Sequence, residues 1–141
     1  MVLLISPINC RKKKTQNEPY NEYGGYGVII NTASVATYEG QIGQVTYSAL
    51  KGGVVDMILP MARGLAQFGI RVNTIVPRLI HSPLFDTFPE NAYKALEASV
   101  VIPQRLGKPE EIALLLVSIV ENEYMNGECI RLNGAIRVHP E

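Results

Sequence analysis

A tyrosine and a lysine stand four residues apart in the stretch TYSALKGGVVDM, and such a pair can handle a proton. A spacing of four places Tyr47 and Lys51 on one face of a helix, with their side chains within reach of each other. A phenol ionises poorly at neutral pH, but an ammonium group close by stabilises the phenolate. The spacing therefore predicts that Tyr47 exchanges a proton with the help of Lys51. Pairs of this kind also occur by chance in helices, so a purely structural role stays open on spacing alone.

A serine at the end of an apolar run adds a second polar group. Residues 27–34 read GVIINTAS, and a continuous apolar run of this kind is typical of a strand buried on both faces of a parallel sheet. Open α/β sheets place their ligands at the carboxyl ends of the strands, which is where Ser34 lies. The Ser34 hydroxyl could hold a substrate oxygen while Tyr47 gives or takes its proton, and Lys51 could bind a cofactor with its remaining donors.

The elements that must position these side chains alternate along the chain. Apolar residues recur at helical spacing from residue 45 to residue 68, with Pro60 expected to kink the helix and Gly69 expected to end it. The further elements expected are a strand in GIRVNTIVP, helices in PENAYKALEASV and KPEEIALLLVSIVEN, and a strand in ECIRLNGA. This alternation of strands and helices predicts an α/β fold with a parallel sheet.

Composition narrows the classes of partner. The 141 residues carry 13 basic and 13 acidic side chains, so no net field draws the protein to nucleic acid or to a membrane surface. Cys10 and Cys129 have no metal-ligand spacing, which predicts no metal site and reduced thiols in an intracellular protein. The apolar start is broken by Pro7 and followed by basic residues, so it fits neither a secretory signal nor a membrane span. Residues 1–26 as a whole are expected to be an irregular lead-in.

The motifs together resemble the short-chain dehydrogenase/reductase family. INTAS, then twelve residues, then YSALK, then GIRVNTIVPRLIHSPL are similar to the family's serine, its Tyr-x-x-x-Lys pair and the segment after its next strand. The resemblance runs from about residue 16 to the C-terminus, and ordered motifs with the right gaps are more specific than any one alone. It implies the C-terminal half of a Rossmann-like, doubly wound parallel sheet, as a partial domain over residues 27–141.

The resemblance also implies a reaction. Members of this kind are NAD-dependent oxidoreductases, and the similarity is to those that act on a 3-hydroxyacyl-CoA or a hydroxysteroid, with a mitochondrial location. In such an enzyme Tyr47 is the general acid/base, Ser34 orients the substrate oxygen, and Lys51 supports Tyr47 and binds the nicotinamide ribose. The remaining residues that match family positions are Ile80 and Ser82 for the nicotinamide end of NAD, and Gln41 for the substrate.

The sequence also departs from the family. It lacks counterparts of the glycine-rich turn, the acidic residue and the Asn-Asn-Ala-Gly segment that serve the adenosine and pyrophosphate half of NAD, so the N-terminal half of the domain is expected to be missing. The catalytic asparagine is absent as well, and Arg78 replaces a glycine. The strand at 27–34 would then have an unpaired edge, which predicts self-association or pairing with a full-length relative. The alternative function is therefore a truncated, inactive fragment that acts only through such association.

Overall fold

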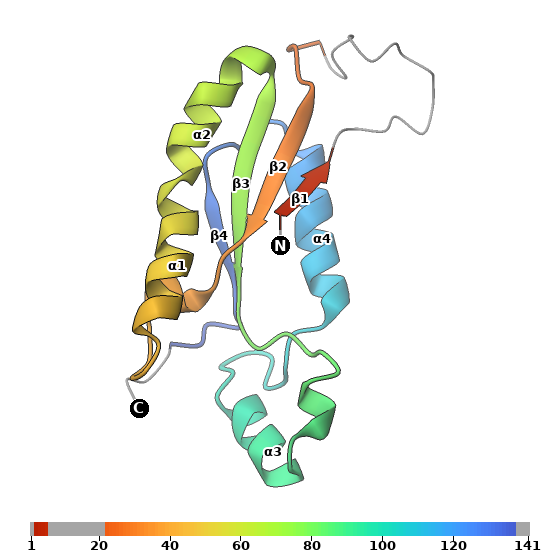
Figure 1. Ribbon diagram of the computed structural model, residues 1–141. Helices are drawn as coiled ribbons and strands as arrows, with labels where there is room; N and C mark the ends of the chain where they lie inside the picture. The colour runs from red at the N-terminus through yellow and green to blue at the C-terminus, as the bar shows by residue number, and fades with distance from the viewer. Residues whose placement is uncertain (1, 6–21, 138–141) are drawn as a thin grey trace.

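Four strands form one sheet in the computed structural model, which describes residues 2–5 and 22–137 (Figure 1). Their spatial order is the same as their order in the chain. Three of them run parallel to one another, whereas the first runs antiparallel to its neighbour. The strands are β1 (Val2–Ile5), β2 (Gly27–Thr32), β3 (Ile70–Pro77) and β4 (Cys129–Leu132).

Helices cover both faces of this sheet, as Figure 1 shows. On one face Ile58 and Ala62 pack against Val72 of β3, and on the other face Ile119 packs against Ile30 of β2. The predicted parallel α/β fold with helices on two faces is thus confirmed. None of the described helices is long and apolar enough to span a membrane. The helices are α1 (Val45–Asp56), α2 (Ile58–Leu65), α3 (Glu90–Ala98) and α4 (Pro109–Glu121), with short 3₁₀ turns η1 (Val35–Thr37), η2 (Ala66–Phe68) and η3 (Phe85–Thr87).

The long helix expected between residues 45 and 68 is interrupted at Met57, between α1 and α2. Pro60 lacks an N–H and its ring crowds the carbonyl four residues earlier, which belongs to Asp56. The helix therefore breaks one turn before the proline, as its chemistry requires. Gly69 ends the following 3₁₀ turn in the left-handed conformation, with φ at 63°.

Gly69 gives the first testable prediction, because a side chain there would be strained twice. Its φ is positive, and an added Cβ would lie 2.1 Å from the carbonyl oxygen of Gly24. We expect Gly69→Ala to lower the free energy of unfolding by about 2 kcal/mol or more. Gly64→Ala is the matched control, since Gly64 lies in α2 with open space around it, and it should gain up to about 1 kcal/mol. Urea unfolding of both variants checks this, and equal effects would contradict it.

The start of the chain differs from the expected irregular lead-in. Residues 2–5 form β1, which pairs along β2 from Val2 opposite Asn31 to Ile5 opposite Val28. The prediction that this edge of the strand at 27–34 is unpaired is therefore wrong, because the apolar run VLLI supplies the missing hydrogen-bond partners. The rest of the lead-in, including the basic run at 11–14, lies outside the described residues.

Candidate active site

Ser34 lies just beyond the carboxyl end of β2, where the chain turns into η1. Its backbone is extended, and its hydroxyl oxygen accepts a hydrogen bond from the Ala36 N–H at 3.3 Å. The neighbouring Ala33 is tied to β3, because its N–H donates to the Ile75 carbonyl at 3.0 Å. Within the described parts of the chain the Ser34 hydroxyl donates no hydrogen bond. Its proton is therefore available to a ligand oxygen at this edge of the sheet.

Lys51 ties α1 to the sheet at the same edge. Its ammonium nitrogen donates to the Thr32 carbonyl at 3.1 Å and lies 5.8 Å from the centroid of the Tyr47 ring. The one-turn spacing read from the sequence thus brings the lysine and the tyrosine together. An ammonium group has three donors, so two remain for other partners.

Tyr47 is half-exposed, with 44% of its surface accessible. Its hydroxyl has no hydrogen-bond partner among residues 2–5 and 22–137, so it is open to a ligand. Helix α1 packs against η1, the turn that Ser34 caps. The structure therefore brings Ser34, Tyr47 and Lys51 to the carboxyl ends of the parallel strands, which is where α/β proteins bind their ligands.

The remaining predicted site residues lie in the loops around this edge. Ile80 follows β3 and is held to Gly107 by a parallel bridge, next to a hydrogen bond from the His81 N–H to the Gly107 carbonyl at 2.8 Å. Ser82 comes two residues later, and its carbonyl accepts from the Phe85 N–H at 2.9 Å. Gln41 lies in the turn before α1, where its backbone N–H donates to the Gln44 side chain at 3.2 Å.

Sequence reasoning missed a charged cluster beside the site. The Glu39 carboxylate, which is largely buried, accepts a hydrogen bond from Arg131 and lies 3.4 Å from Arg137 Nε. Arg131 also lies over the Tyr38 ring, 5.2 Å from its centroid. These residues come from segments 92 positions apart, so no local spacing signals the cluster.

The backbone after β3 does not take the left-handed conformation at Arg78. Arg78 stands where the family has a glycine, yet the left-handed conformation occurs at the next residue, Leu79, with φ at 49°. Arg78 itself donates its N–H to the Leu132 carbonyl at 3.1 Å. An arginine is therefore compatible with the backbone at this position.

An ion pair fixes the start of α4 below the site. Arg105 donates two hydrogen bonds to the Glu111 carboxylate, at 2.8 and 2.9 Å, and the Lys108 N–H donates a third at 2.6 Å. The hydrogen bonds from Arg105, which have the largest effect, and from the Lys108 N–H lower the pKa of Glu111 from 4.5 to about 2. The carboxylate thus helps to cap the helix in its ionised form.

The second prediction follows from this depressed pKa. Because the folded state holds the Glu111 proton less tightly than the unfolded state, the stabilisation is complete above pH 4.5 and is lost as the pH falls towards about 2. We expect Glu111→Gln to be less stable than the unmutated chain at pH 7, with the difference shrinking steadily below pH 4.5 and vanishing only below about pH 2. Urea unfolding at several pH values checks this, with Glu110→Gln, an exposed neighbour, as control. A deficit that does not change with pH would contradict it.

Comparison with known proteins agrees with this arrangement. The family model described as enoyl-(acyl carrier protein) reductase matches residues 4–135. The chain is 56% identical over 125 residues to the 3-hydroxyacyl-CoA dehydrogenase type-2 of Homo sapiens. This alignment covers 89% of this chain and 48% of the human protein. The chain is 36% identical over 112 residues to an acetoacetyl-CoA reductase of Synechocystis, covering 77% of this chain and 46% of the reductase.

A solved structure is similar as well. The crystal structure of 3-hydroxyacyl-CoA dehydrogenase type-2 from Mycobacterium avium superposes with a TM-score of 0.81 at 40% identity, covering 89% of this chain and 48% of that one. The chain therefore spans about half the length of the relatives it matches. In the described residues, no group of three or more His, Cys, Asp or Glu side chains could hold a metal ion. From the matched family model, the relatives and the shared fold, the chain belongs to the short-chain dehydrogenase/reductase family.

Proposed function

We propose that the protein is an NAD-dependent oxidoreductase that interconverts an alcohol and a ketone, with a 3-hydroxyacyl-CoA or a hydroxysteroid as substrate. One observation carries the proposal: Lys51 lies 5.8 Å from the Tyr47 ring and 3.1 Å from the Thr32 carbonyl, at the strand end that leads into Ser34. A phenol, an ammonium and a hydroxyl at one sheet edge are the groups that proton transfer to a carbonyl oxygen requires. The names of the matched relatives support the substrate class.

Each residue has a separate task in this proposal. The Ser34 hydroxyl donates to the substrate oxygen and holds it in place, while Tyr47 gives that oxygen a proton on reduction or takes it back on oxidation. The positive charge of Lys51 stabilises the phenolate that this proton transfer leaves on Tyr47. Gln41, in the turn before α1, would contact the rest of the substrate.

The nicotinamide end of NAD fits the residues that are present. Lys51 has two N–H donors beyond its bond to Thr32, which suit the hydroxyls of a ribose. Ile80 and Ser82 would contact the nicotinamide from the loop after β3. When bound, the cofactor supplies or accepts the hydride that the protein's own side chains cannot carry.

Isothermal calorimetry with NADH tests the proposal. We expect saturable binding to the unmutated chain and a loss of at least about tenfold in affinity for Lys51→Ala, because the variant removes the donors to the ribose. Lys94→Ala is the control, since Lys94 lies on the surface of α3 and forms an exposed ion pair with Glu90. Absence of binding at millimolar NADH would contradict the enzyme proposal.

A second candidate function is favoured by the exposed apolar surface of α1. None of its residues is buried, and Val45 and Leu50 expose 80% and 64% of their surfaces. Such a surface suits a chain that acts only through association, with itself or with a full-length relative. Sedimentation of the chain alone and mixed with such a relative tests this. A monodisperse monomer in both samples would contradict it.

A further inference from the structure

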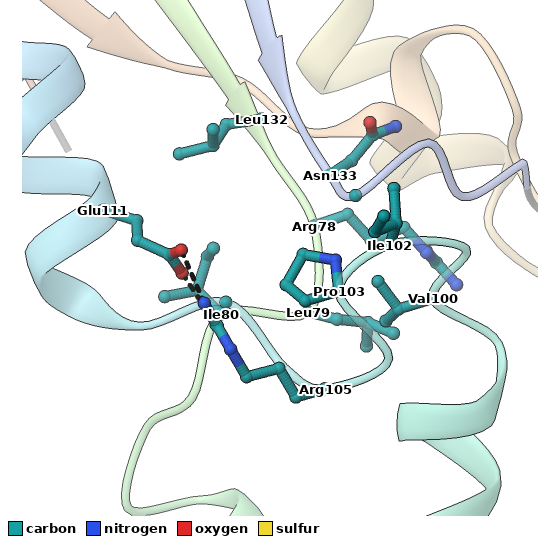
Figure 2. Close-up of a pocket in the computed structure, with 12 residues that line it drawn as sticks. Arg78, Leu79, Ile80, Val100, Ile102, Pro103, Arg105, Glu111, Leu132 and Asn133 are labelled. Atoms are coloured by element: carbon teal, nitrogen blue, oxygen red, sulfur yellow. Dashed lines mark hydrogen bonds and ion pairs between the residues drawn. The ribbon is translucent and has the colours of Figure 1, made fainter.

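A small pocket with mostly apolar walls lies below the carboxyl end of β3 (Figure 2). Its volume is about 190 Å³, which corresponds to roughly six water-sized groups. Val100, Ile102, Pro103 and Leu132 supply much of the wall, and Arg78 and Asn133 supply polar groups. Three separate segments of the chain thus meet around one cavity.

The two arginines of this pocket differ in their partners. Arg105 forms a bidentate ion pair with Glu111, so its charge is compensated. Arg78 has no carboxylate within ion-pair distance in the described residues, and its Nε is buried without a hydrogen-bond partner. Figure 2 shows the Arg105–Glu111 pair on one side of the pocket and Arg78 with Asn133 on the other. The pocket therefore has one neutralised end and one cationic end.

The charge of Glu39 does not neutralise Arg78. Burial lowers the pKa of the Arg78 guanidinium, and the charge of Glu39 only partly offsets this effect. Glu39 is shared, because it also pairs with Arg131 and Arg137. Among the described residues, three guanidinium groups thus face the one carboxylate of Glu39, which is an excess of positive charge. A partly buried cation without a partner is costly, so an anion that reached its remaining N–H groups would be bound favourably.

We propose that this pocket binds a carboxylate on a short aliphatic stem, with Arg78 holding the carboxylate and the stem lying along Val100, Pro103 and Ile102, the last of which is 74% exposed. The volume suits about six non-hydrogen atoms, as in butanoate. A guanidinium and a carboxylate match in planar, bidentate geometry. The apolar walls favour an organic anion over a bare inorganic one, because burying the stem adds to the charge interaction. The inference concerns binding alone and does not depend on the proposed redox activity.

NMR titration of the full chain, labelled with ¹⁵N at arginine and ¹³C at the isoleucine methyl groups, tests this pocket. Butanoate should shift the Arg78 Nε–H and the Ile102 methyl signals saturably. Butanamide, which has the same shape without the charge, should bind at least about tenfold more weakly to the unmutated chain. Inorganic phosphate should also bind at least about tenfold more weakly, because it lacks the stem. This part of the test needs no substitution, so it does not depend on whether a variant folds.

Substitutions then test whether Arg78 is the residue that binds the carboxylate of butanoate. Arg78→Met should lower the affinity for butanoate by at least about tenfold. Arg78→Lys should lower it by less, since lysine keeps the positive charge but cannot make the bidentate contact of a guanidinium. Arg63→Met, an exposed arginine in α2, is the control and should bind as the unmutated chain does. Equal binding of butanoate and butanamide, phosphate binding as tight as butanoate, or unchanged affinity in Arg78→Met would each overturn the proposal.

Discussion

Tyr47→Phe is expected to lower the rate of acetoacetyl-CoA reduction by NADH by about 10²- to 10⁴-fold. This is the range that a positioned general acid contributes, and the substitution removes only the hydroxyl that would carry the proton. The ring and its contact with Lys51 stay in place, so the affinity for NADH should change little. A loss in kcat with nearly constant cofactor affinity is thus the expected signature.

The control for this experiment is a second tyrosine near the same sheet edge. Tyr38 is also half-exposed, at the end of η1, but its ring lies under Arg131 rather than beside Lys51. Tyr38→Phe should therefore keep the rate within about threefold of the unmutated chain, as neutral surface changes usually do. Both rates are read from NADH absorbance. A Tyr47→Phe chain that also stays within this range would contradict the assignment of the proton to Tyr47.

Much of the fold could be predicted because local patterns encode it. The apolar run of β3 and the proline-led start of α4 are both visible in the sequence, and both elements form where those patterns lie. The strand at residues 2–5 could not be predicted in the same way. Its four apolar residues are too few to signal a strand, and its partner β2 lies more than twenty positions away. Such a pairing depends on which edge of the sheet is open, and no local pattern encodes that.

In the candidate site, too, contacts within one helix could be predicted from the sequence, whereas contacts between distant segments could not. The spacing of Tyr47 and Lys51 is a helical pattern, so their proximity could be predicted from the sequence alone. The anchor of Lys51 could not be, because a backbone carbonyl such as that of Thr32 is present at every residue and carries no signal. The excess of positive charge around Arg78 could not be predicted from the sequence either, since it depends on where Glu39 and Arg131 meet in space.

Arg71→Met is expected to lower the free energy of unfolding by about 3 kcal/mol, although Arg71 touches no part of the candidate site. Only 8% of its surface is exposed, and within the described residues its hydrogen-bond partners include no acidic side chain. Its guanidinium instead donates to four backbone carbonyls at the C-terminal end of α4 and just beyond it. They belong to Ile119, Val120, Asn122 and Met125, at distances from 2.8 to 3.2 Å.

The large effect follows from what the substitution leaves behind. The last carbonyls of a helix have no partner within the helix, and the macrodipole makes this end attractive to a cation. Methionine fills a similar space but donates nothing, so several partly buried carbonyls lose their hydrogen bonds at once. Urea unfolding at pH 7 measures the change, with exposed Arg63→Met expected to stay within about 0.5 kcal/mol. A loss of less than about 1 kcal/mol for Arg71→Met would mean that water replaces the guanidinium at these carbonyls, and that packing alone holds α4 against the sheet.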